Sequence, residues 1–124
     1  MKVKFAAGSN IAMKVPSHEY EETVSFYRDT LGFEVLGPNP PGEVEATCFR
    51  FGAAKLWIDR IPGLSQAEIW LQVETDDIEA AADYLEERAC PRRDEIEPLP
   101  ASMNGFWISN PANVIHLVVR EDAD

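Results

Sequence analysis

The sequence contains an internal repeat, in which a pattern near the N-terminus recurs in the second half of the chain. One constant offset carries Asn10 to Glu68, Val15 to Val73 and Tyr20 to Ile78, and it needs no gap. A chain built from two copies of one pattern is expected to form two similar sets of strands and helices. The repeat therefore limits the fold to paired modules.

Each copy of the pattern begins with a segment in which apolar and polar residues alternate. These segments cover residues 10–15 and 68–73, and a third alternating segment covers residues 115–120. A period of two predicts strands that pack on one face only. A helix is predicted after each of the first two strands. The first helix has a stripe of apolar residues at helical spacing, Tyr20, Val24, Tyr27 and Leu31, and the second begins with the capping sequence Asp76–Glu79.

Each half is completed by three further expected strands, which gives the order strand, helix and three strands twice. The expected strands are 33–36, 46–51 and 54–60, and then 94–97, 105–109 and 114–120. We expect one domain over residues 1–124, with modules of about 8–61 and 66–120. An offset longer by a single position relates Trp57 to His116, so these two side chains are expected on equivalent faces.

The sheet faces expected opposite the helices carry polar and aromatic side chains. These residues are Asn10, Lys14, Lys55, Trp57, Asp59, Glu68, Trp70, Gln72, His116 and Arg120. Large indole rings on an open wet surface are prone to aggregation, so Trp57 and Trp70 favour a concave pocket. Trp107 joins them if it, and not Phe106, points inward. A solvated sheet face, a core position and a dimer contact remain alternatives for the tryptophans.

Two segments resemble motifs of the vicinal oxygen chelate superfamily, which includes glyoxalase I, extradiol dioxygenases and bleomycin-resistance proteins. Ser25–Phe33 is similar to the family pattern F-Y-x-x-x-L-G-F, and Asn110–Leu117 is similar to D-P-x-G-N-x-x-E-L, with departures at Asn110, Ala112 and His116. The resemblance implies an α+β fold. Two tandem βαβββ modules would form a cup-shaped mixed sheet, with the helices outside and the site in the concave face. It also implies a homodimer.

The resemblance further implies four inward positions for metal ligands, which are Asn10, Trp57, Glu68 and His116 in this sequence. Glu68 and His116 have side chains that bind divalent metals such as Zn, Fe, Ni or Mn, whereas Asn10 is a weak ligand and Trp57 is none. Glu68 and His116 could equally form an ordinary hydrogen-bonded pair. The sequence therefore does not establish a cofactor.

Two functions follow from this face. The first is the binding of a small aromatic or cationic molecule by Asn10, Trp57, Asp59, Trp70 and Trp107, as in antibiotic sequestration, with stacking and cation–π contacts supplying affinity. The second is a metal-dependent lyase, isomerase or dioxygenase, in which a metal acts as Lewis acid and Asp59 acts as general base.

The net charge narrows the set of partners. The chain has 11 Lys and Arg residues against 22 Asp and Glu residues, a formal net charge of −11. Such a chain repels phosphate backbones and acidic membrane surfaces, so nucleic-acid and membrane partners are not expected. The N-terminus lacks the apolar stretch of a signal peptide, and the two cysteines are too few for a disulfide framework. We therefore expect a cytoplasmic protein with reduced thiols.

Overall fold

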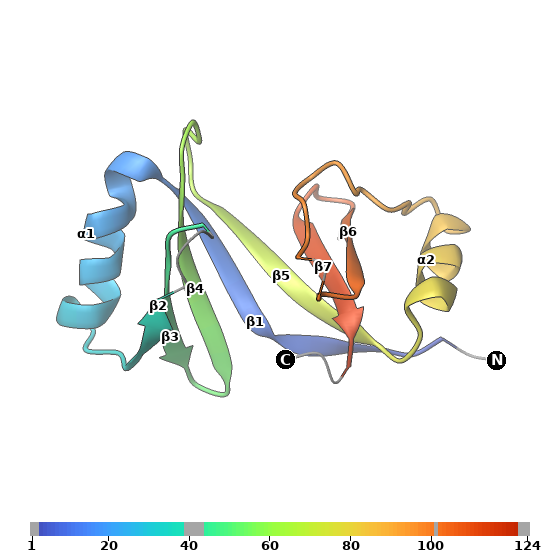
Figure 1. Ribbon diagram of the computed structural model, residues 1–124, viewed down its shortest axis with the longest axis horizontal. Coiled ribbons are helices and arrows are strands. Elements are labelled where there is room, and N and C mark those ends of the chain that lie inside the picture. Colours follow the sequence, from blue (N-terminus) through green and yellow to red (C-terminus); the bar gives the residue numbers. More distant parts are fainter. Residues whose placement is uncertain (1–2, 39–43, 101, 122–124) are drawn as a thin grey trace. The chain divides into compact units, whose positions relative to one another are not determined.

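The computed structural model describes residues 3–38, 44–100 and 102–121, and it has the α+β architecture that the repeat predicts (Figure 1). The first half contains β1 (Phe5–Pro16), η1 (Ser17–Glu19), α1 (Tyr20–Ser25), η2 (Phe26–Thr30), β2 (Val35–Pro38), β3 (Ala46–Phe51) and β4 (Ala54–Ile61). The second half contains β5 (Glu68–Thr75), α2 (Ile78–Glu86), β6 (Gly105–Ser109) and β7 (Ile115–Arg120). Parallel and antiparallel neighbours both occur, so the predicted mixed sheet is confirmed. Within the described ranges no helix is long and apolar enough to cross a membrane.

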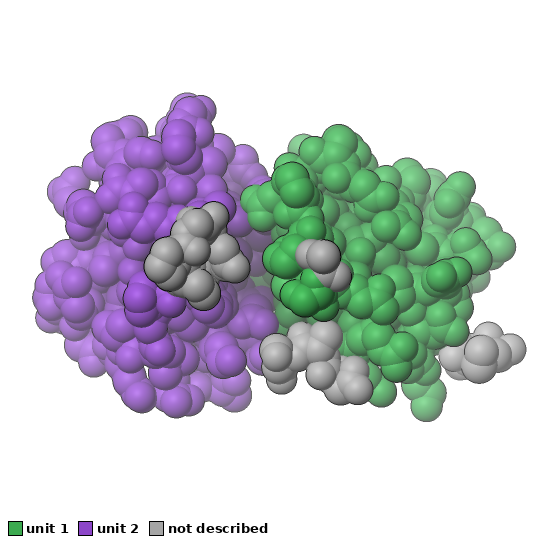
Figure 2. Space-filling model, viewed as in Figure 1, with its two compact units in different colours: residues 1–8, 71–124 green, residues 9–70 purple. Residues whose placement is uncertain are grey.

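The chain divides into two compact units, which Figure 2 shows in different colours. We call residues 9–70 the first unit, and residues 1–8 with 71–124 the second unit. The expectation of a single domain with modules of about 8–61 and 66–120 stays a prediction.

In the first unit, α1 covers one face of strands that lie in the order β2-β3-β4-β1. β1 runs parallel to β4, and β3 runs antiparallel to both of its neighbours. The core between helix and strands contains Val15, Tyr20, Val24, Phe49, Leu56 and Ile58, with Ile11 and Met13 packed against it. The residues that alternate with these on β1 and β4 therefore face away from α1. We call this opposite surface the far face of the first unit.

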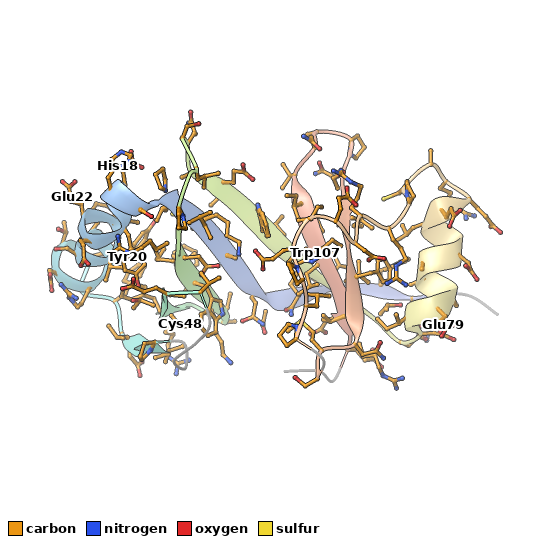
Figure 3. All side chains as sticks on the ribbon, turned by 45° about the horizontal axis from the view of Figure 1, so that its top comes forward. His18, Tyr20, Glu22, Cys48, Glu79 and Trp107 are labelled. Carbon is orange, nitrogen blue, oxygen red and sulfur yellow. The ribbon has the colours of Figure 1, made fainter. Side chains whose placement is uncertain are left out.

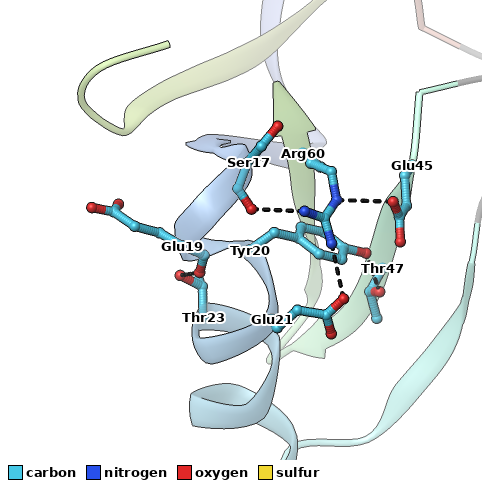
Figure 4. Close-up of polar contacts among 8 residues, drawn as sticks. All are labelled: Ser17, Glu19, Tyr20, Glu21, Thr23, Glu45, Thr47 and Arg60. Carbon is cyan, nitrogen blue, oxygen red and sulfur yellow. Dashed lines mark hydrogen bonds and ion pairs between the residues drawn. The ribbon is translucent and has the colours of Figure 1, made fainter. Parts of the chain in front are cut away.

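Arg60 fixes the start of the helical segment against the strands of the first unit (Figure 4). Its guanidinium donates hydrogen bonds to Glu21, Glu45 and the Ser17 carbonyl at 2.7–2.9 Å. It also lies over the Tyr20 ring, with Cζ 4.5 Å from the ring centroid. A single side chain therefore joins β4 to the beginning of α1.

In the second unit, α2 packs on a sheet in which β5 runs parallel to β7 and β6 runs antiparallel to β7. The core contains Ile78, Ala81, Ala82, Phe106, Ile108 and Val118. The Asp77 side chain caps α2 by accepting a hydrogen bond from the Ala80 amide at 3.1 Å. Gly105 permits close packing of β6 on β7, because a Cβ at this position would lie 2.5 Å from the Val118 carbonyl oxygen. The capping sequence thus gives the predicted helix, with Asp77 as the capping residue.

The strand expected at residues 94–97 does not form, so that prediction is wrong. The Arg93 amide donates to the Trp107 carbonyl at 2.7 Å, but the Ile96 amide then turns back to the Arg93 carbonyl at 3.1 Å. The prolines on both sides of this stretch have no amide hydrogen for a strand ladder. The segment therefore contacts β6 through isolated hydrogen bonds and does not form a regular strand.

The expected face of His116 is also wrong. Lys14 pairs with Asp59 between β1 and β4, and Gln72 pairs with Leu117 between β5 and β7. The offset that relates Asn10 to Glu68 also relates Lys14 to Gln72 and Asp59 to Leu117. By the same offset, His116 corresponds to Ile58 and not to Trp57. His116 shares the face of Val118, which belongs to the core under α2. Arg120 lies on the same face by alternation.

The error of a single position has a physical cause in β7. Val118 and Val119 are 0% and 1% exposed, so both faces of this strand are buried. A strand that is apolar on both sides carries no alternation to fix its orientation, and a slip by one position reverses every side chain.

Candidate functional site

The far face of the first unit gathers polar and aromatic side chains from β1, β4 and the start of β5. On β1, Ile11 and Met13 pack toward α1, so Asn10 and Lys14 point the other way. On β4, Leu56 and Ile58 belong to the same core, which leaves Trp57 and Asp59 on the far face. The register brings these residues together, because Lys14 lies opposite Asp59.

Asn10 and Trp57 contact each other directly. The Trp57 indole donates a hydrogen bond from Nε1 to Asn10 Oδ1 at 2.9 Å, and both residues are half-buried. Cys48 on β3 lies opposite Trp57 in the register, and it is buried. Burial raises the pKa of the Cys48 thiol, so this cysteine is held in its protonated form and is a poor nucleophile.

Lys14 and Asp59 form a buried ion pair next to this contact. Lys14 Nζ lies 2.8 Å from Asp59 Oδ2, and the two residues are only 5% and 8% exposed. Removing one member of such a pair leaves an uncompensated buried charge, which is strongly destabilising. Asp59, the expected general base, is therefore tied to a lysine ammonium.

Trp70 covers the ion pair from β5. Lys14 Nζ lies 4.3 Å from the centroid of the Trp70 ring, a cation–π contact. The Trp70 indole donates from Nε1 to Glu68 Oε1 at 3.0 Å. Each of the two tryptophans on this face thus has its N–H held by a neighbouring side chain, which fixes the orientation of its ring.

Trp107 belongs to the second unit, and it is packed differently. It alternates with Phe106 and Ile108 of the core under α2, so it points to the opposite side of β6. The residue is only 5% exposed, and its indole donates to the Glu97 carbonyl at 2.8 Å. Figure 3 labels Trp107 in the second unit and Cys48 in the first. Trp107 therefore supports the packing of the 93–97 segment.

The residues at the expected metal positions do not fit a divalent ion. The oxygens of Asn10 and Glu68 each accept an indole N–H, and the Lys14 ammonium occupies the same face. His116 lies on the face that α2 covers, with Nδ1 3.0 Å from the Val114 carbonyl oxygen. The described part of the chain contains no group of three or more His, Cys, Asp or Glu residues placed to hold a metal.

Sequence reasoning missed the role of Lys14. Alternation places Lys14 and Asp59 on one face, but the contact between them joins positions 45 residues apart. The signal that could have found it is the charge pair together with the parallel strand register. That register is seen only in the structure, where Lys14 lies opposite Asp59.

The sequence matches no protein-family model, and no curated protein matches it by sequence. The fold, however, is similar to that of solved structures. A variant of methylmalonyl-CoA epimerase from Streptomyces coelicolor in complex with 2-nitronate-propionyl-CoA aligns with a TM-score of 0.65 and 20% identity, over 97% of this chain and 100% of that one. A glyoxalase/bleomycin resistance protein/dioxygenase superfamily member from Vibrio splendidus 12B01 aligns with a TM-score of 0.59 and 19% identity, over 89% and 97%.

A variant of 4-hydroxymandelate synthase from Streptomyces coelicolor aligns with a TM-score of 0.68 and 19% identity, over 92% of this chain and 38% of the synthase. At these identities the likeness concerns the fold. The resemblance drawn from the two sequence motifs is confirmed at that level.

Proposed function

We propose that this chain, which has the vicinal oxygen chelate fold, binds a small flat aromatic molecule on the far face of the first unit. The observation that carries the proposal is the pair of indoles on this face, Trp57 and Trp70, whose N–H groups are held by Asn10 and Glu68. Rings that are already oriented lose little conformational freedom when a guest stacks on them, which favours binding.

The charges favour a guest that is neutral or cationic over one that is anionic. The net charge of −11 repels anions at long range, and Lys14 is already paired with Asp59. Binding without chemical conversion, as in sequestration of an antibiotic, is the role that these residues support best. The predicted cytoplasmic location would suit that role, and cell fractionation tests it.

Isothermal titration calorimetry tests the proposal with two probes of similar shape and opposite charge. We expect 1-methylquinolinium to bind and naphthalene-2-sulfonate to bind much more weakly. Trp70→Ala should weaken binding of the cation about fivefold, because loss of one stacking contact amounts to roughly 1 kcal/mol. Trp107→Phe is the matched control, since that tryptophan is packed in the second unit, and it should bind like the wild type.

Two results would overturn the proposal. One is the absence of any heat of binding with either probe. The other is a Trp70→Ala variant that binds normally. Elemental analysis after dialysis addresses the alternative, a metal-dependent lyase, isomerase or dioxygenase. We expect far less than one equivalent of metal, and a full equivalent of Zn, Fe, Ni or Mn would favour the enzyme.

A further inference from the structure

An open groove follows the helical segment of the first unit from η1 through α1 to the start of η2. We call it the helix groove. It has a volume of about 310 Å³ and is lined by Glu19, Glu22, Thr23, Phe26 and Tyr27. Successive members are three or one residue apart, so they share one face of the helix. The helix groove is separate from the far face, because α1 covers the other side of the strands.

Two aromatic rings form one end of the helix groove. The rings of Phe26 and Tyr27 are arranged edge to face, with centroids 5.1 Å apart and planes at 87°. The Tyr27 ring also lies near Phe33 and Phe49, at centroid distances of 6.1 and 5.9 Å, so it is anchored on the core. Phe26 is 46% exposed and rests against this anchored ring. Ring faces carry partial negative charge, so a corner of this kind attracts a cation.

The backbone at this end of the groove is irregular. The Leu31 amide bonds to the Phe26 carbonyl five residues back at 2.9 Å, which makes η2 a π-helical turn. The apolar stripe of the sequence predicts Leu31 in the core, yet the residue is 46% exposed, because the wider turn rotates it out of the stripe. Turns of this type are rare and occur frequently at functional sites. The turn begins at Phe26, the exposed ring of the groove.

Two carboxylates supply negative charge along the rest of the groove. Glu22 forms no ion pair with any described residue, and Figure 3 shows it on the outer side of the helical segment, away from the strands. Glu19 Oε2 lies 3.5 Å from His18 Nε2. The Thr23 hydroxyl donates to the Glu19 carbonyl at 2.7 Å, so its hydrogen is already used (Figure 4). No basic residue lines the groove. It therefore disfavours anions.

We propose that the helix groove binds a small quaternary ammonium compound. Such a cation spreads its charge over methyl groups, which pack against ring faces without giving up hydrogen bonds to water. The carboxylates add long-range attraction, and the net charge of −11 acts in the same direction. The far face is proposed for flat aromatic guests, whereas this groove takes a compact alkyl cation. The two sites therefore bind different chemical classes.

NMR titration with choline and its neutral isostere 3,3-dimethylbutan-1-ol tests the charge requirement. The two molecules have the same shape, but a carbon replaces the nitrogen in the second. Choline should shift the backbone amide signals of residues 19–27 in a saturable manner, and the isostere should bind much more weakly. Equal binding of the two probes, or no saturable shift with choline, would overturn the proposal.

Two substitutions test the parts of the groove separately. Phe26→Leu keeps an apolar side chain and removes the ring face, so choline should bind about fivefold more weakly. Glu22→Gln keeps the shape and removes a charge, and it should weaken choline about twofold. The matched controls are Phe5→Leu and Glu79→Gln, which alter exposed residues of the second unit and should bind choline like the wild type.

The outcomes separate this site from the far face. Trp70→Ala should leave choline binding unchanged, and Phe26→Leu should leave 1-methylquinolinium binding unchanged. Choline shifts confined to the indole signals of Trp57 and Trp70, or a Phe26→Leu variant that binds choline normally, would overturn the proposal. Thermal melts of each variant report folding. If Phe26→Leu does not fold, normal choline binding by Glu22→Gln would overturn the proposal.

Discussion

Equivalent strand positions carry a charged pair in the first half of the chain and an uncharged pair in the second half. Lys14 and Asp59 pair in the first unit, and the residues equivalent to them by the repeat, Gln72 and Leu117, pair in the second. The first pair is a buried ion pair beside half-buried indoles, whereas Leu117 lies opposite the buried Trp107. The comparison teaches that the repeat preserves strand register, while the chemistry of each face is set by a few residues.

The largest expected effect is on the free energy of unfolding, and it shows whether the two halves unfold together. Phe49 and Phe106 are 0% and 1% exposed and occupy the core under α1 and under α2. Phe49→Ala and Phe106→Ala should each lower the free energy of unfolding by about 3–5 kcal/mol, since each leaves a large cavity. Urea unfolding measures this. We expect one transition that moves in both variants, whereas two transitions with only one displaced would show independent halves.

A second prediction concerns variants in which the ion pair of the first half is replaced by the residue types of the equivalent pair in the second half. Lys14→Gln should lower the free energy of unfolding by about 3 kcal/mol, because Asp59 keeps a buried charge without its counter-ion. The double variant Lys14→Gln with Asp59→Leu should recover most of this loss, since no charge is then buried. A double-mutant cycle from urea unfolding gives the coupling. Losses that simply add would show that Lys14 and Asp59 do not stabilise each other.

The smallest effect concerns the one cysteine in each half. Burial raises the pKa of the Cys48 thiol, whereas Cys90 is half-buried with its Sγ 3.6 Å from the Ser109 carbonyl oxygen. Iodoacetamide reacts with the thiolate, so Cys90 should be modified first and Cys48 should need a higher pH. Intact-mass analysis of Cys90→Ser, which retains only Cys48, isolates the slower reaction. Equal rates in the two halves would show that Cys48 is not shielded.

The parts of the fold that the sequence could predict are those with one buried and one polar face. The alternation in β1 places Ile11 and Met13 toward the helix and Asn10 and Lys14 away from it, and the structure agrees. β7 has two buried faces, so its alternation is ambiguous and the predicted orientation of His116 is wrong. The strand predicted at 94–97 does not form because the Ile96 amide turns back to the Arg93 carbonyl, and the prolines on either side of the stretch are the only local signal of this.

The candidate site also has a part that the sequence predicts and a part that it does not. Asn10, Trp57, Asp59 and Trp70 can be assigned to one face from local patterns alone. Their mutual contacts cannot, because those contacts depend on strand register and on rotamers that bring an indole to a carboxamide or a carboxylate. The metal hypothesis is weakened for this reason, since a ligand set requires side chains that converge and not only the right residue types.

The parallel pairing of β1 with β4 also governs how the chain folds. Lys14 and Asp59 are 45 residues apart, so the chain must close a long loop before the first rung of this ladder forms, whereas β3 and β4 meet through a tight turn. Closing the loop costs entropy before the stabilising contacts have formed, so non-local pairing is slow. Trp57 reaches Asn10 only after that closure. In a variant that keeps only this tryptophan, its fluorescence therefore reports, on a stopped-flow timescale, when the first half of the chain becomes native.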